Sequence, residues 1–562
     1  MTGPAPREPA PDGGPQGPDA GPGAPSGATP GAGPGAVPGA GPGAGPGAGP
    51  GAGPGAGPGA VPGAVPVGAP VGAGGPGVAL GTARGRWIVL VTVLGSTMAL
   101  LDSTVVNVAL PSIGRDFGAD MAVLQWIVNA YLLTLAGLIL VGGALGDRFG
   151  RRRIFVLGVV WFAAASLLCG VAPDEGVLIA ARALQGVGGA LLTPGSLALI
   201  QGSIASADRA RAVGLWSGFG GVGAAVGPFL GGWLVDGPGW RWVFLLNVPV
   251  AAVCVPVALR HVPESRDPAA RGRFDVLGAA LGAVALGLVT YALIEARSGS
   301  PAVVASAVVG VLLAVAFVWV ERRRAEPMMP PDIFASRQFT AVNLVTLFVY
   351  AAFGGFFFLI VLQLQVVSGY SALAAGAALL PTTALMLLLS SRAGALGERI
   401  GPRIPLTVGP LLCAAGLLLM LRVGPDASYV QDVLPGMVVL GMGMVTLVAP
   451  LTEAVLASVD PGRAGLASGI NNAAARVAGL LAVAALPLLA GMGPDAYLSA
   501  ALFDSAFGRA MVWCAGALAV GAALAWATVR APRPGACHPR CRTHCALTAP
   551  PLEPPEETPP RA

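Results

Sequence analysis

Asp102 and Arg182 each lie inside a long apolar run of the sequence, where ionisable side chains are rare. A charged group at the centre of a lipid bilayer costs at least ~2.5 kcal/mol, so such residues usually serve a function and face the interior of a helix bundle. Burial away from water favours the neutral form of a carboxyl group, which would let Asp102 take up and release protons. The pattern predicts proton transfer, with a structural ion pair without a transport role as the alternative.

The depth of these residues in the membrane can be counted along the chain. At ~1.5 Å of rise per helical residue, Asp102 and Arg182 lie at nearly the same depth in the outer half of the membrane, so they can meet directly or through water. Arg476 is a third polar group near the midplane, where it lines a pocket or pairs with another charge. Glu453 lies near the inner end of its run, where we expect a carboxylate that reaches the interface rather than a coupling site.

The composition indicates a polytopic membrane protein, because 54% of the residues are apolar, 11% are charged and the mean hydropathy is +0.73. The chain has arginine but no lysine, which excludes a phosphate-binding P-loop and a lysine Schiff base to a cofactor. We therefore expect no cofactor, and uphill work must draw on an ion gradient or on a separate ATPase chain. The arginines lie in short loops, a distribution that sets membrane topology and does not indicate nucleic-acid binding.

Cysteine and histidine give little sign of metal or enzyme chemistry. Four cysteines lie singly in apolar runs and are expected to be small buried hydrophobes: Cys169, Cys254, Cys413 and Cys514. The segment C-H-P-R-C-R-T-H-C from Cys537 to Cys545 offers thiols and imidazoles, but its spacing is not that of common zinc sites, so we predict no metal site and leave a partner-binding or mobile tail as the main reading. No histidine lies within an apolar run and no carboxylates are paired there, which argues against a membrane enzyme.

Fourteen apolar runs are long enough to cross the membrane, which takes roughly 20 helical residues. Their predicted bounds are 87–110, 125–145, 154–171, 177–201, 212–235, 242–259, 276–294, 302–320, 340–364, 372–389, 404–421, 430–455, 465–490 and 510–529. With the amino terminus in the cytoplasm, the outer loops carry only Arg115, Arg241, Arg297, Arg422 and Arg509. This asymmetry predicts a multi-pass protein of the plasma membrane with both termini cytoplasmic.

Two loops have nearly the same sequence, G-A-L-G-D-R-F-G-R-R-R at 143–153 and G-A-L-G-E-R-I-G-P-R-I at 394–404. A duplicated loop indicates two similar halves, as secondary transporters need for alternating access. We predict an all-α integral membrane fold with a six-helix bundle at 84–261, a linker with two extra spans at 262–337 and a second six-helix bundle at 338–530. Residues 1–83 form a disordered Gly/Ala/Pro-rich leader, and residues 531–562 form a disordered cytoplasmic tail.

The first of these loops is predicted to turn on Gly146 and Gly150, and the two loops are predicted to latch the halves together through charge. A plain positive-inside anchor is the alternative. The predicted gating residues are Gly143, Asp147, Arg148, Gly150, Arg151, Gly394, Glu398 and Arg399. The fifth span is rich in glycine and is bent by a proline, which predicts a deformable seam between the halves, with ordinary tight packing as the alternative. Its key residues are Gly223, Gly227, Pro228, Gly231 and Gly232.

Aromatic and amide side chains within the spans can line an apolar cavity that holds a few polar anchors, although each of them is also typical of ordinary helix packing. The predicted substrate-cavity residues are Asn107, Trp126, Asn129, Tyr131, Gln185, Trp216, Gln363, Asn471, Asn472 and Arg476.

Several of these segments together resemble a known family. The duplicated loop is similar to the signature of the major facilitator superfamily. Four further segments resemble motifs of its fourteen-span drug:proton antiporters: L-D-S-T-V-V-N-V-A-L-P at 101–111, Q-W-I-V-N-A-Y at 125–131, R-A-L-Q-G-V-G-G-A from Arg182 and G-A-A-V-G-P-F-L-G-G at 223–232. The resemblance implies a major facilitator fold, proton transfer by Arg182, coupling or cation recognition by Asp102, and a fifth-span motif that marks exporters.

We therefore predict a proton-coupled efflux transporter that exports hydrophobic or cationic drugs or secondary metabolites as a monomer. Its partners are a small-molecule substrate, protons and the lipid bilayer. Protonation of Asp102 would compete with substrate binding and bias the bundles between inward-open and outward-open states. The alternatives are a proton symporter for small organic solutes and a non-transporting membrane sensor.

Overall fold

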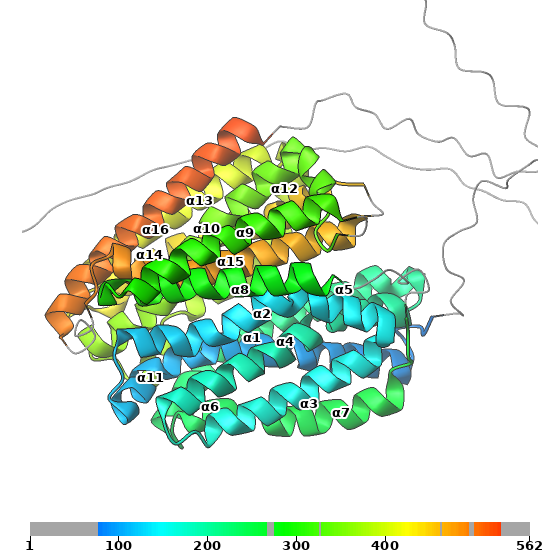
Figure 1. The fold of residues 1–562 in the computed structure, drawn as a ribbon, viewed down its shortest axis with the longest axis horizontal. Helices are drawn as coiled ribbons and strands as arrows, with labels where there is room; N and C mark the ends of the chain where they lie inside the picture. The colour runs from blue at the N-terminus through cyan, green and yellow to red at the C-terminus, as the bar shows by residue number, and fades with distance from the viewer. Residues whose placement is uncertain (1–76, 267–274, 325–326, 461–462, 494–498, 530–562) are drawn as a thin grey trace, which may run out of the picture. The chain divides into compact units, whose positions relative to one another are not determined.

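The computed structural model describes residues 77–266, 275–324, 327–460, 463–493 and 499–529 (Figure 1). Apart from one isolated β-bridge, the regular structure of this part is helical. The first group of helices comprises α1 (Ala83–Phe117), α2 (Met121–Phe149), α3 (Arg151–Gly170), α4 (Glu175–Ser203), α5 (Arg209–Asp236), α6 (Arg241–Leu245) and α7 (Asn247–His261). The second comprises α10 (Arg337–Leu362), α11 (Ala372–Ala377), α12 (Leu380–Ile400), α13 (Arg403–Leu419), α14 (Leu434–Leu456), α15 (Ala464–Leu489) and α16 (Ala500–Thr528). Between them lie α8 (Val276–Ile294) and α9 (Pro301–Arg323).

The helices agree with the predicted membrane spans. Within the described residues, 13 helices are long and apolar enough to cross a membrane, and they match all the predicted spans except the fifth. The predicted fifth span coincides with α5, whose 28 residues cover about 42 Å at ~1.5 Å per residue. The expected all-α membrane fold is therefore confirmed. The last span differs at its start, because α16 begins at Ala500 and places Arg509 within the helix, where it donates to the carbonyl of Ala490 at 2.7 Å.

Two predicted spans are broken by proline. The sixth consists of α6 and α7, and α6 ends at Leu245, four residues before Pro249. The tenth consists of α11 and α12, and α11 ends at Ala377, four residues before Pro381. Proline has no N–H to donate to the carbonyl four residues earlier, so each helix stops at the residue whose hydrogen bond is missing.

The two groups of helices pack in the same way, which supports two related six-helix bundles. In the first bundle α2 and α3 pack on α4, and α1 packs on α5. In the second, α12 and α13 pack on α14, and α10 packs on α15. The contacts between the bundles also correspond, since α5 packs on α11 while α2 packs on α15. This exchange of equivalent partners is expected for halves related by a pseudo-twofold axis.

The extra helices α8 and α9 form a hairpin beside the bundles. Figure 1 shows α8 running lengthwise between the first bundle and the second, and α8 contacts both α2 and α15. Only 11% of the most apolar 18-residue stretch of α9 is buried. Most side chains of this helix therefore face outwards, as expected for contact with lipid.

After α9 the chain forms the short helix η3 (Pro331–Ala335). Here Arg463 donates to the carboxylate of Asp332 at 2.5 Å, and this bond holds the pKa of the carboxyl group below its usual range.

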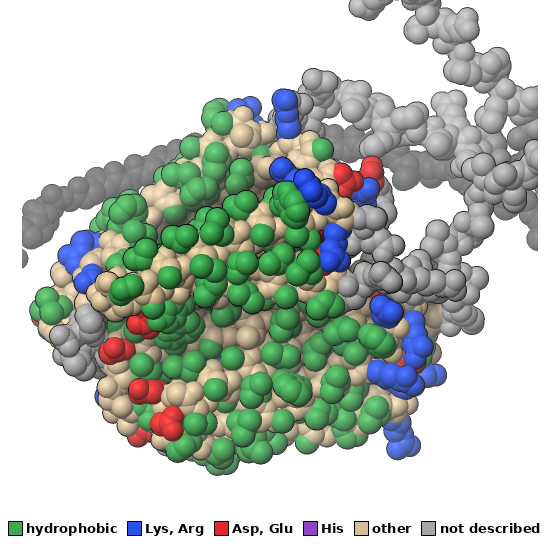
Figure 2. Space-filling model, viewed as in Figure 1, with side chains coloured by type: hydrophobic (Ala, Val, Ile, Leu, Met, Phe, Trp, Pro, Cys, Tyr) green, Lys and Arg blue, Asp and Glu red, His purple; other side chains and the backbone are tan. Residues whose placement is uncertain are grey.

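The surface has an apolar belt between two polar ends, as expected for a membrane protein (Figure 2). Figure 2 shows hydrophobic side chains over the middle of the molecule and a larger group of arginines at the end where α1 begins. We call this the arginine-rich end. Hydrogen bonds join the two bundles at the opposite end. There Gln125 donates to the carbonyls of Val483 and Ala484 at 2.7 and 3.0 Å, and Asp236 accepts from the backbone amides of Ala372 and Leu373 at 3.2 and 2.8 Å.

Residues 77–82, which were predicted to belong to the leader, have defined contacts. Val78 forms the isolated β-bridge with Ile204: its amide donates to the carbonyl of Ser203 at 2.9 Å, and its carbonyl accepts from the amide of Ala205 at 3.1 Å. The amide of Leu80 donates to the carboxylate of Asp208 at 2.8 Å. The predicted leader boundary at residue 83 is therefore wrong for residues 77–82, which pack against the connection between α4 and α5. The rest of the predicted leader, the predicted tail and the Cys537–Cys545 segment lie outside the described residues.

Candidate functional site

Asp102 and Arg182 form a buried ion pair inside the first bundle. Nη1 of Arg182 donates to Oδ2 of Asp102 at 2.5 Å, and the two side chains are 1% and 0% exposed. Asp102 comes from the middle of α1 and Arg182 from α4, which lie in contact. Such a pair is retained only where hydrogen bonds satisfy the remaining polar atoms, so its neighbours determine what it can do.

Three further polar side chains complete this network. Gln185 donates to Oδ1 of Asp102 at 2.7 Å and to Ser166 at 2.7 Å, while its own oxygen accepts from Arg182 at 2.6 Å. Asn247, the first residue of α7, donates to the same Oδ1 at 3.4 Å. The carboxylate is thus held by donors from α4 and α7. Ser166 and Asn247 were not predicted from the sequence as part of the site. Asn247 could have been noticed in the sequence, because it is a polar residue within an apolar run and stands two residues before Pro249.

Arg182 connects this network to the space between the bundles. Its Nε donates to the carbonyl of Ile127 at 3.1 Å, and its guanidinium lies 4.3 Å from the centre of the Tyr131 ring. Both Arg182 and Tyr131 line a cavity of about 580 Å³, whereas Asp102 does not. The acidic group is therefore one side chain removed from the cavity, and a change in its charge reaches the cavity through Arg182.

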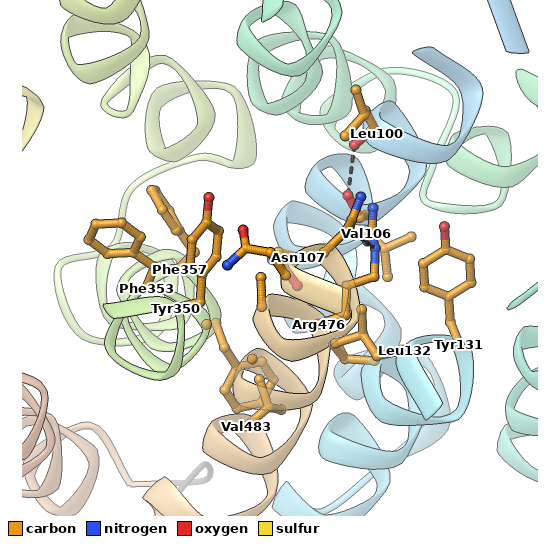
Figure 3. A pocket seen from close by; sticks show the side chains of 18 of the residues that line it. Leu100, Val106, Asn107, Tyr131, Leu132, Tyr350, Phe353, Phe357, Arg476 and Val483 are labelled. Atoms are coloured by element: carbon orange, nitrogen blue, oxygen red, sulfur yellow. Dashed lines mark hydrogen bonds between the residues drawn. The ribbon is translucent and has the colours of Figure 1, made fainter. Parts of the chain in front are cut away.

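This cavity lies between the bundles and has mixed walls. Figure 3 shows Tyr350, Phe353 and Phe357 on one side, Tyr131 on the other, and Asn107 and Arg476 between them. Its volume is in the range of small-molecule sites, which bind through apolar walls and a few polar groups. Five of the predicted cavity residues line it, and these are Asn107, Tyr131, Asn471, Asn472 and Arg476. Tyr350 was not identified from the sequence.

The other predicted cavity residues do not line this cavity. Gln185 is part of the ion-pair network, and Trp126 donates to Glu295 at 3.2 Å beside α8. Trp216 donates to Ser96 at 2.9 Å, and Gln363 donates to Asp504 at 2.6 Å. The fifth of them, Asn129, is fully buried, and within the described residues neither of its amide atoms has a partner. The other four side chains form local hydrogen bonds inside or beside the bundles, which their residue types alone could not reveal.

The first duplicated loop is anchored to its own bundle. Asp147 bonds to Arg151 at 2.8 Å, one helical turn away across the junction of α2 and α3. Gly150 makes the turn with φ = 115°, and a side chain there would collide with Glu264. The amide of Arg152 donates to that same Glu264 at 3.0 Å. Among the described contacts, Asp147 and Arg151 bond to each other and the turn packs on Glu264 just after α7, and none of these contacts forms the predicted latch between the halves.

The prediction that the first loop turns on Gly146 is wrong, and Gly143 also lies within a helix rather than in a loop. Gly146 does not turn the chain, because α2 continues to Phe149 and the carbonyl of Gly146 accepts from the amide of Gly150 at 3.0 Å. Gly143 also lies within α2 and faces Pro194. Arg148, the remaining predicted residue of this loop, lies over the ring of Phe149, 5.6 Å from its centre.

In the second duplicated loop the corresponding turn falls at Gly401, with φ = 78°. Gly394 lies in α12 opposite Glu453, and Arg399 is exposed in the last turn of the same helix. The side chain of Glu398 lies outside the described residues. The second copy thus repeats the helix–glycine turn–helix form of the first.

The glycines of α5 allow close packing on two helices. A side chain at Gly223, Gly227 or Gly231 would collide with Thr97, Thr104 or Val105 of α1. Gly232 instead faces α11, where an added Cβ would lie 2.4 Å from the carbonyl oxygen of Ala372. The carbonyl of Pro228 faces Gly376 of α11 in the same way. At these glycines α5 therefore packs tightly on α1 of its own bundle and on α11 of the second bundle.

Gly232→Leu is expected to lower the thermal stability of the purified protein, because overpacking a tight contact costs ~1–3 kcal/mol. Gly214→Leu on the same helix is the matched control, since no atom lies within 4 Å of its added Cβ. Melting followed by differential scanning fluorimetry would compare the two variants. Equal melting temperatures would show that the α5–α11 contact is not tight in the membrane protein as purified.

Comparisons with known proteins agree with this architecture. The model of the Major Facilitator Superfamily matches residues 92–483. The puromycin resistance protein pur8 of Streptomyces alboniger is 39% identical over 463 residues, which cover 79% of this chain and 91% of that protein. The multidrug resistance protein Stp of Mycobacterium tuberculosis is 37% identical over 421 residues, which cover 74% of this chain and 76% of that protein. A crystal structure of the POT family transporter PepTSo matches with a TM-score of 0.59 at 14% identity, covering 79% of this chain and 98% of that one. A family match over most of the apolar core and close relatives over three quarters of the sequence leave one conclusion: the chain is a multi-pass membrane protein that belongs to the Major Facilitator Superfamily.

Proposed function

We propose that this protein exports bulky amphipathic compounds from the cytoplasm in exchange for protons, as a monomer. The observation that carries the proposal is the buried Asp102–Arg182 pair, whose arginine lines the central cavity. The names of relatives as drug-resistance proteins support export as the direction of transport. The proposal places both termini in the cytoplasm, with the arginine-rich end on the inner side.

The conformation fits the loading step of an exporter. The cavity extends to Thr452 and Ser468, two exposed residues near the arginine-rich ends of α14 and α15. At the opposite end the bundles are held together by Gln125 and Asp236. A cavity that is open at the inner side and closed at the outer side can take compounds from the cytoplasm or from the inner leaflet.

Proton coupling runs through Arg182 in this proposal. When Asp102 is ionised, its carboxylate neutralises Arg182 and fixes the guanidinium beside Tyr131. Protonation of Asp102 removes that charge and leaves an uncompensated guanidinium at the cavity wall, which raises the energy of this conformation relative to others. A ligand and a proton can then bias the same pair of states without touching each other. Direct competition for Asp102 is not needed, because the carboxylate does not reach the cavity.

The test of this function uses inverted membrane vesicles with an acidified lumen. An antiporter releases protons from the lumen when a transported compound is added, whereas a symporter does not. We expect members of a panel of amphipathic antibiotics and dyes of either charge to lower the proton gradient in vesicles that contain the protein. Vesicles without the protein are the control. No change in the gradient with any member of the panel would contradict proton-coupled export.

A further inference from the structure

The cavity has an excess of positive charge. Among the described residues that line it there are two guanidinium groups and no carboxylate. Arg182 is neutralised by Asp102. Arg476 of α15 has no comparable partner, because within the described part of the chain it forms no ion pair. Counting the described residues, the cavity therefore carries one uncompensated positive charge when Asp102 is ionised.

The guanidinium of Arg476 is only partly used by the protein. Its Nε donates to Oδ1 of Asn472 at 3.2 Å, and no described carboxylate or carbonyl accepts from either of its Nη atoms. The neighbouring Asn471 is already engaged, because its amide donates to Asn343 at 3.1 Å and to Thr346 at 2.8 Å. The two Nη groups thus remain as a pair of parallel donors, the arrangement that binds a carboxylate in a bidentate way.

Aromatic rings line the cavity on two sides of this guanidinium (Figure 3). Figure 3 shows Arg476 between Tyr131 and the group of Tyr350, Phe353 and Phe357. Tyr350 and Phe353 pack edge to face at 6.0 Å, and Phe353 and Phe357 do so at 6.5 Å. Such walls favour a planar aromatic body, while the guanidinium favours an acidic substituent on it. The same guanidinium repels a cation in a cavity whose walls have a low dielectric constant.

We propose that the cavity selects aromatic anions, with an acidic group of the cargo bound to Arg476 and its rings held between Tyr131 and Phe353. This inference rests on the proposed export function and narrows its substrate class. The resemblance of the sequence to antiporter motifs left hydrophobic and cationic compounds as the expected cargo. The charge of the cavity adds a preference that those motifs do not contain.

Two xanthene dyes of similar shape and opposite charge test the preference, fluorescein as the anion and rhodamine 6G as the cation. Fluorescence polarisation with the purified full-length protein would give both affinities. We expect fluorescein to bind at least tenfold more tightly than rhodamine 6G. Equal affinity, tighter binding of the cation, or absence of fluorescein binding would overturn the inference. This comparison needs no variant, so it holds even if a variant fails to fold.

Arg476→Gln then tests the residue itself. We expect this variant to lose at least tenfold in affinity for fluorescein and to bind rhodamine 6G as well as the unchanged protein or better. Arg115→Gln is the matched control, because Arg115 lies exposed near the end of α1, outside the cavity, and bonds only to Ser112 within the described residues. Arg476→Lys should keep part of the preference. A preference that is the same in the Arg476→Gln and Arg115→Gln variants would remove Arg476 from the inference.

The outcome separates this inference from the proposed function. Proton-coupled export together with equal affinity for both dyes would keep the proposed function and overturn the anion preference. Binding of fluorescein that depends on Arg476, in a protein that never exchanges compounds for protons, would keep the anion site and overturn the proposed function.

Discussion

Cells that produce the Asp102→Asn variant will export no more compound than cells without the protein. Asparagine keeps the size of the side chain and can still accept a hydrogen bond from Arg182, but it cannot take up or release a proton. It also leaves the buried Arg182 without a counter-charge, and the loss of one partner from a buried pair costs ~3–5 kcal/mol. Proton release and dye uptake by inverted vesicles would measure the effect, with the amount of folded protein checked by size-exclusion chromatography.

The double variant Asp102→Asn/Arg182→Gln separates proton transfer from a structural role. If the pair only holds α1 and α4 together, removal of both charges relieves the penalty of the unpaired arginine, and export should return. If Asp102 carries the proton, the double variant should fold at least as well as the single variant and still fail to exchange protons. We expect the second result. Export by the double variant at half or more of the original rate would contradict a proton-carrying Asp102.

Asp102→Glu is the conservative control. It keeps an ionisable carboxyl group but lengthens the side chain by one methylene in a fully buried site, where added volume costs ~1–3 kcal/mol. We therefore expect reduced export with proton coupling retained. The contrast between the glutamate and asparagine variants would assign the effect to ionisation rather than to packing.

The arrangement of the membrane spans could be predicted because it depends on the length of apolar runs and on loop charge. These properties are local in the sequence and are imposed by the bilayer. The breaks after Leu245 and Ala377 follow from prolines four residues later, so they too were predictable in principle. The packing of residues 77–82 on the α4–α5 connection was not predictable. It depends on a few hydrogen bonds, two between backbone groups and one to the side chain of Asp208, that join segments more than a hundred residues apart.

The sequence could predict how deep the residues of the candidate site lie in the membrane, but not which way their side chains point. Counting residues placed Asp102 and Arg182 at the same level, and they do meet. The same counting cannot tell that Gln185 turns towards Asp102 while Arg476 turns into the cavity, because the rotation of each helix is set by its neighbours. Glu264 was missed for a similar reason. It lies far along the chain from Gly150 and meets it only because α7 ends beside the α2–α3 turn.

The position of Arg182 accounts for the separation of cargo from proton. A carboxylate exposed in the cavity would have to be stripped of its proton by the cargo itself, which restricts the cargo to compounds that bind a carboxylate. A carboxylate behind an arginine needs only a change in the energy of that arginine. Such a site can exchange protons for compounds of either charge, and the remaining charge in the cavity then decides between them.

Export of an anionic dye will depend strongly on membrane potential, whereas export of a cationic dye of similar shape will not. In a one-to-one exchange, a proton that enters while a monoanion leaves moves two positive charges inwards, but a proton that enters while a monocation leaves moves none. Each charge that crosses 100 mV is worth about 2.3 kcal/mol, so a negative interior adds roughly 4.6 kcal/mol to the export of the anion. At about 1.4 kcal/mol per tenfold change, the limiting concentration ratio of the anion should rise by roughly three orders of magnitude.

Proteoliposomes with a potassium gradient and valinomycin would set this potential, with the proton gradient held constant. The anionic dye should be transported away from the negative side faster as the potential grows, and Arg476→Gln should reduce its transport at every potential. A cationic dye in the same liposomes is the control for leakage of the bilayer. Equal responses of the two dyes would mean that cargo charge is compensated by extra protons or by a counter-ion. In that case the net charge moved per cycle would not depend on the charge of the cargo.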